Sequence, residues 1–153
     1  LGAHVPEAVA PAVIHGDYHL DNTLASPDEP KILAIIDWEL ATVGDPYMDV
    51  ALMLMFWGEY RTQEPPAFTA LQSISRRSGV ISRRELAGRW AESVGRPLHH
   101  MNFYMAFWRL AAIVEGAYGL FLAGQLTSDY ARGLEYDVPA LLAEAERAAR
   151  GDW

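Results

Sequence analysis

The sequence predicts a mainly α-helical domain of the α+β class, in which a small β hairpin precedes a helical bundle. Two short apolar segments, at residues 12–15 and 31–38, flank a turn of proline and acidic residues, which is typical of strands joined by a hairpin. After residue 44, apolar residues recur mostly at helical spacing. The 153 residues are 51% hydrophobic and 21% charged, which is enough to bury one core. We therefore treat residues 1–153 as one structural unit.

The β part consists of "AVIH" (12–15) and "KILAIIDW" (31–38), an isoleucine-rich run. Between them, "SPDEP" (26–30) has the composition of a turn. We predict that the two segments pair with each other across this turn. Residues 1–11 contain two prolines and are predicted to be a loop.

The first helix is predicted within residues 44–57. Asp45 suits the N-cap position, and Pro46 suits the first helical position, where the missing N–H has no partner to lose. Val50 and Leu54 then follow the spacing of one helix face.

Further helices are predicted over residues 67–78, 83–94, 101–123 and 138–150. The second of these follows a Ser-x-x-Glu capping box formed by Ser82 and Glu85, and Gly95 ends it. The third is apolar and long enough to span a membrane, but Arg109 and Glu115 lie near its middle. Each charge would cost about 2.5–3.5 kcal/mol there, so we predict a buried helix at the centre of a globular lobe and no membrane partner.

Charge and composition exclude several classes of function. Twenty acidic residues against twelve basic ones give a net charge of −8, which argues against a nucleic-acid partner. The chain has no cysteine, so it contains neither a disulfide nor a thiolate metal site. This composition fits the cytoplasm, where we expect the protein to reside.

The stretch "VIHGDYHLDNTL" (13–24) concentrates polar residues in one loop. It contains the spacing His15-x-Asp17-x-x-x-x-Asn22, and Asp37 follows Asn22 by fifteen residues at the end of the second apolar run. A kinase catalytic loop has this pattern, followed by a separate metal-binding aspartate. One carboxylate can take the proton of an acceptor hydroxyl, and amide and carboxylate oxygens suit Mg²⁺. Taken alone, the same residues could simply be turn formers.

Three ordered motifs, "HGDYHLDN", "AIIDWE" and "GDPYMDVA", resemble those of the aminoglycoside phosphotransferase and choline kinase superfamily, which has a protein-kinase-like fold. The particular form that these motifs take here is similar to their form in one branch of the superfamily. That branch includes the kinase-like domains of some acyl-CoA dehydrogenase family proteins. The later segments of the chain also fit that branch.

The resemblance implies a role for each matching position. Asp17 corresponds to the catalytic base, Asn22 and Asp37 to ligands of the Mg²⁺ that accompanies ATP, and Leu24 to the apolar residue beneath the adenine ring. The implied function is Mg-ATP-dependent phosphotransfer to a hydroxyl group of a small molecule.

Other polar residues near these motifs have open roles. His15 corresponds to a histidine that supports the loop. Asp49 either braces that loop or only complements the dipole of its helix. His19 is either a phosphate contact or a solvated loop residue, and His99 and His100 are expected to be capping or surface residues.

The elements that grip a triphosphate are absent from the sequence. It has neither a G-x-G-x-x-G nor a G-x-x-x-x-G-K-[ST] motif, and Lys31 is its only lysine. The resemblance places those elements in an amino-terminal lobe, so we expect this chain to be the carboxy-terminal lobe alone. We expect it to have little activity by itself and to form a homodimer through the uncovered face of the lobe.

Two alternatives remain open at this point. One is a metal-dependent phosphoesterase that uses His15, Asp17, His19 and Asp37. The other is a non-catalytic binding or dimerisation module. The sequence does not identify the acceptor substrate.

Overall fold

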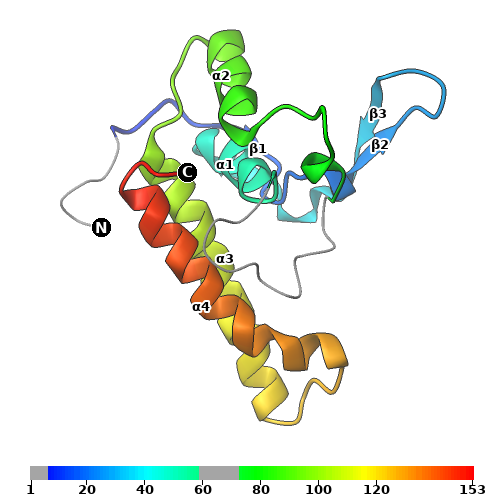
Figure 1. Cartoon of the computed structure of the whole chain (residues 1–153), viewed down its shortest axis with the longest axis vertical. Helices are drawn as coiled ribbons and strands as arrows, with labels where there is room; N and C mark the ends of the chain where they lie inside the picture. The colour runs from blue at the N-terminus through cyan, green and yellow to red at the C-terminus, as the bar shows by residue number, and fades with distance from the viewer. Residues whose placement is uncertain (1–6, 59–72) are drawn as a thin grey trace.

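The computed structural model describes residues 7–58 and 73–153. This part of the chain is mostly helical and carries two small antiparallel sheets (Figure 1), in agreement with the predicted mainly α class. The strands are β1 (Ala12–Ile14), β2 (Thr23–Ala25), β3 (Ile32–Ile35) and β4 (Thr42–Gly44). The helices are α1 (Tyr47–Met55), α2 (Arg83–Val94), α3 (His100–Leu122) and α4 (Asp129–Ala149).

The predicted pairing of residues 12–15 with 31–38 is wrong. β1 pairs with β4, with Val13 opposite Val43, and β3 pairs with β2, with Leu24 opposite Ala34. The turn at residues 26–30 is short, so it closes a hairpin with the segment directly before it, which is β2. We missed β2 because its three residues follow the polar loop without a break.

The start of α1 carries the predicted aspartate cap. Oδ1 of Asp45 accepts the N–H of Tyr47 at 2.9 Å. The helix begins at Tyr47 rather than Pro46, a difference that is ordinary at helix ends. Val50 and Leu54 are both buried, as their spacing predicted.

α2 confirms both predicted ends. Oγ of Ser82 accepts the N–H of Glu85 at 3.1 Å, and Gly95 closes the helix with φ +69°. The helix predicted at 67–78 is described only from residue 73, where residues Ser73–Arg76 form a single 3₁₀ turn. Its first part, residues 67–72, lies outside the described residues.

α3 and α4 form a long antiparallel pair that extends away from the β part (Figure 1). α4 begins at Asp129, well before the predicted residue 138, because the side chain of Ser128 caps the N–H of Ala131 at 3.1 Å. Pro139, near the start of the predicted segment, lies inside α4. Figure 1 shows the first turns of α4 at an angle to the rest, as expected where a proline removes a main-chain hydrogen bond.

The core joins α1, α3 and α4. Phe103 and Phe107 on α3 and Leu141 on α4 are fully buried against Leu54 of α1. The prediction that α3 is a buried central helix is nevertheless only partly right, because only 22% of its most apolar window is buried within this chain. By length and composition alone, this helix is the one in the described residues that could cross a membrane.

Candidate active site

The loop that follows β1 is held by one carboxylate of α1. The main-chain N–H groups of His15 and Gly16 donate to Oδ2 and Oδ1 of Asp49 at 2.7 and 2.9 Å. His15 and Gly16 are buried, so these amides have no water to bond instead. Asp49 lies in the first turn of α1, where its charge also complements the helix dipole. Its two direct hydrogen bonds show that it braces the loop as well.

The ring of His15 is fully engaged. Nε2 donates to the carbonyl oxygen of Ile36 at 2.8 Å, and Nδ1 accepts the N–H of Asp17 at 3.2 Å. We infer this tautomer from the two partners. The ring of Trp38 packs against it, with centroids 4.7 Å apart. His15 is therefore a supporting residue, and neither ring nitrogen is free to bind a metal ion.

The side chain of Asn22 is anchored by its nitrogen. Nδ2 donates to the carbonyl oxygen of Asp17 at 2.8 Å and to Oδ2 of Asp17 at 3.1 Å. Oδ1 of Asn22 accepts no hydrogen bond from residues 7–58 and 73–153, so it could serve as an oxygen ligand. Asn22 and Asp17, which the sequence spaced five apart, are thus in direct contact.

The main chain of Ile36 connects this loop to Asp37. Its N–H donates to the carbonyl oxygen of Asn22 at 3.0 Å, while its own carbonyl accepts from His15. Asp37 is the next residue, so its position relative to Asn22 is fixed through one residue of main chain. No pattern of side chains indicates this role of Ile36, because the role depends only on its peptide groups.

Asp37 has a left-handed backbone, with φ 66° and ψ 55°. It is the only non-glycine residue with positive φ in the described part of the chain. Aspartate and asparagine tolerate this conformation better than other residues, and such backbones concentrate at functional sites. The Asp37 side chain is exposed next to the loop.

Leu24 lies on β2, where 50% of its surface is exposed. Its side chain is therefore open to solvent in this chain, as a residue that contacts a ligand ring would have to be. Trp38 lies within the motif "AIIDWE", and the sequence interpretation predicts no role for it. Its position directly after Asp37 was the signal that could have suggested one.

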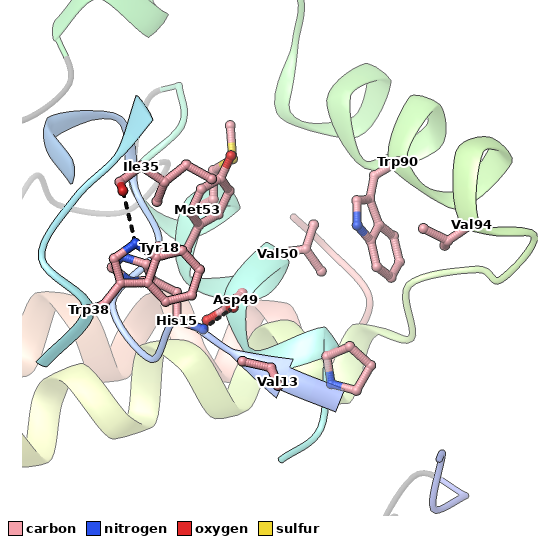
Figure 2. Close-up of a pocket in the computed structure, with 11 residues that line it drawn as sticks. Val13, His15, Tyr18, Ile35, Trp38, Asp49, Val50, Met53, Trp90 and Val94 are labelled. Carbon is pink, nitrogen blue, oxygen red and sulfur yellow. Dashed lines mark hydrogen bonds between the residues drawn. The ribbon is translucent and has the colours of Figure 1, made fainter. Parts of the chain in front are cut away.

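A pocket of about 400 Å³ lies behind the loop, between β1, α1 and α2. Trp38 and Trp90 lie on opposite sides of it, and Asp49 points toward the main chain of His15 between them (Figure 2). The lining is mostly apolar and does not include Asp17, Asn22 or Asp37. These three predicted site residues therefore do not line this pocket.

The donor set suits magnesium better than a transition metal. No group of three or more histidine, aspartate or glutamate side chains in residues 7–58 and 73–153 is arranged to hold a metal ion. One amide and one carboxylate, Asn22 and Asp37, fit the habit of Mg²⁺ to share its ligands between protein and phosphates. A phosphoesterase with two metal ions needs more ligands than this.

Comparisons with known proteins agree with these motifs. The sequence model of the phosphotransferase enzyme family matches residues 1–96. The chain is 34% identical over 135 residues to acyl-CoA dehydrogenase family member 10 of Mus musculus, and 34% identical over 121 residues to family member 11 of Homo sapiens. These matches cover 84% and 76% of the chain but only 12% and 15% of the relatives.

A solved structure from Ralstonia eutropha JMP134, described as a candidate aminoglycoside phosphotransferase, superposes with a TM-score of 0.78 at 27% identity. The match covers 97% of this chain and 46% of that one. The mostly helical architecture with small antiparallel sheets is consistent with a kinase-like fold. On the family match, the chain belongs to the phosphotransferase enzyme family.

Proposed function

We propose that this chain is the carboxy-terminal lobe of a small-molecule kinase that transfers a phosphoryl group from Mg-ATP to a hydroxyl. The observation that carries the proposal is the contact of Asn22 with Asp17 together with the main-chain link from Asn22 through Ile36 to Asp37. These contacts gather Asp17, Asn22 and the main chain next to Asp37 around one loop, which supports the roles proposed for them. Phosphoryl transfer needs mainly positioning and charge neutralisation, and both can be supplied by such a rigid arrangement.

Each residue has one task in this mechanism. Asp17 accepts the proton of the acceptor hydroxyl as the hydroxyl oxygen bonds to the γ-phosphorus of ATP and the bond from that phosphorus to the β–γ bridging oxygen breaks, which releases ADP. Asn22 and Asp37 would hold Mg²⁺, which would neutralise charge on the phosphates. Leu24 packs against the adenine ring. Asp49 and His15 touch no reactant and hold the loop in place.

The isolated chain should nevertheless bind ATP weakly. Its only lysine, Lys31, lies at the β2–β3 turn, where it is 3.7 Å from Glu29 and 62% exposed. It is unable to contact phosphates beside Asp37 in the way that the strand lysine of a kinase does. We propose that an amino-terminal lobe supplies that contact in the complete protein.

Calorimetric titration with Mg-ATP tests the proposal on two proteins: this chain, and a version that extends about one hundred residues further toward the amino terminus. We expect the extended protein to bind and this chain to bind at least tenfold more weakly. Asp37→Asn should weaken binding by the extended protein about ten- to hundredfold, since it removes a charged ligand of Mg²⁺. Asparagine keeps the tolerance for positive φ, so the fold should be unaffected.

Asp28→Asn is the matched control, because Asp28 is an exposed aspartate at the β2–β3 turn. It should leave binding unchanged. Failure of the extended protein to bind nucleotide, combined with uptake of Mn²⁺ or Zn²⁺, would instead favour the phosphoesterase. Failure to bind either, with an intact fold, would leave a non-catalytic module.

A second proposal concerns the surface of the β part. Ile32 and Leu33 are 48% and 58% exposed, and Ile36 is 39% exposed. Neighbouring strand residues point to opposite faces, so both faces of the β2–β3 hairpin present apolar side chains. A two-stranded hairpin has little stability without cover.

We propose that the amino-terminal lobe covers this hairpin in the complete protein and that the isolated chain self-associates through it. Light scattering at about 100 μM should show a dimer or larger species, because exposed apolar area drives association. Leu33→Ser should shift it toward monomer, whereas Leu142→Ser, on the exposed side of α4, should not. A monomer at that concentration would contradict the proposal.

A further inference from the structure

His19 is enclosed although it lies in a polar loop. Only 14% of its side chain is exposed, and its ring packs against Phe56 at the end of α1, with centroids 5.1 Å apart. It is therefore not the solvated loop histidine that the sequence left open. Its surroundings are acidic, which also argues against a role as a phosphate contact.

Each ring nitrogen of His19 faces a carboxylate. Nε2 lies 3.4 Å from Oδ2 of Asp17, and Nδ1 lies 3.6 Å from Oδ2 of Asp21. These distances exceed those of an ordinary hydrogen bond. Nδ1 is buried and has no hydrogen-bond partner among the described residues, and a buried polar atom of this kind calls for an explanation.

The surroundings of Asp17 explain how His19 is oriented. Oδ2 of Asp17 receives a hydrogen bond from Nδ2 of Asn22 at 3.1 Å. Nδ2 of Asn22 also lies within hydrogen-bonding distance of Nε2 of His19, at 3.4 Å, but its two shorter contacts, at 2.8 and 3.1 Å, are to oxygen atoms of Asp17. Nε2 is therefore best matched to Oδ2 of Asp17 as well. Both nitrogen groups approach the same oxygen, and Oδ1 receives no hydrogen bond within the described part of the chain.

We propose that His19 is a positioning residue for Asp17, and that Asp21 steadies the imidazole from its other side. The inference rests on the proposed function. It assigns to His19 a role that the resemblance of the three motifs did not imply. The Asp17 side chain is 39% exposed and would otherwise be held by Asn22 alone. With two groups on Oδ2, the carboxylate is fixed with Oδ1 toward the acceptor hydroxyl. Phe56 keeps the imidazole from turning out to solvent.

The contact can be tested on this chain without any activity. In histidine-labelled protein, the ring nitrogens of His19 are assigned by their loss in His19→Gln. We expect Asp17→Asn to shift the Nε2 resonance of His19 clearly, because it replaces the facing carboxylate. Asp28→Asn, at the exposed hairpin turn, should leave it in place. Equal spectra for the two variants would overturn the contact and with it the proposal.

The positioning role is tested in the complete protein by ATP turnover with water as acceptor. His19→Phe keeps a ring against Phe56 but has no nitrogen. We expect it to lower kcat about tenfold with KM for Mg-ATP within twofold of its original value, since small displacements of a reacting group are costly. His19→Gln, which retains an N–H donor, should recover most of the loss.

The two measurements separate the inference from the proposed function. An unchanged kcat in His19→Phe, or a loss confined to KM, would overturn the positioning role. Absence of turnover in the unsubstituted protein would contradict the kinase function itself, and the spectra would then decide alone whether His19 contacts Asp17.

Discussion

Gly16→Ala should destabilise the fold by about 2–5 kcal/mol, the sum of a left-handed backbone and a steric overlap. Gly16 has φ +86°, and a Cβ at this position would overlap the carbonyl oxygen of Leu40. The Leu40 carbonyl carbon and Cβ would also lie only 3.0 Å away. The 3₁₀ turn that contains Leu40 would have to move, and it directly follows Asp37. Urea unfolding followed by circular dichroism measures the loss.

Gly79→Ala is the matched control for this prediction. Gly79 has φ +85°, but a Cβ there meets nothing within 4 Å. It should therefore cost only the backbone term, about 1–2 kcal/mol. The difference between the two variants isolates the close approach of Leu40 to Gly16 in the loop after β1. Equal losses would show that the loop can move aside at no cost.

Asp49→Ala should cost about 2–5 kcal/mol, because it leaves the buried N–H groups of His15 and Gly16 without an acceptor and each unpaired group costs about 1–3 kcal/mol. Asp49→Asn should cost less, since its one remaining oxygen can still accept. The order of stability should be original protein, then asparagine, then alanine, again measured by urea unfolding.

Asp129→Ala provides the control for Asp49. Asp129 also lies in the first turn of a helix, α4, but its side chain is 95% exposed and forms an ion pair with Arg132 on the same helix. Its loss should cost about 0.3–1 kcal/mol, the value of a helix-dipole interaction. If Asp49→Ala were no worse than Asp129→Ala, the brace would contribute nothing beyond the dipole.

The sequence allowed the ends of α2 and the contacts in the polar loop after β1 to be predicted because both depend on neighbouring residues. The cap Ser82 bonds the main chain three residues away. In the loop, Asp17 and Asn22 are five residues apart and contact each other directly. Contacts between residues so close in the chain can be predicted from their spacing in the sequence.

The pairing of β1 with β4 could not be predicted in the same way. Its partners are about thirty residues apart, and three-residue strands leave too short a pattern to select a partner. The early start of α4 was missed for a different reason. Packing of Ala131 and Leu134 into the bundle outweighs the local cost of Pro139 within the helix, and tertiary packing is not visible from propensity.

The main-chain link through Ile36 has a consequence for how such a site varies. Its N–H and carbonyl join Asn22 to His15, and every residue type except proline offers the same two groups. The main chain at position 36 can thus be essential for the geometry of the site, while the type of side chain there can vary. Related chains should differ freely at this point while keeping the same spacing between ligand and base, so a motif defined by side chains alone would overlook the peptide that holds it together.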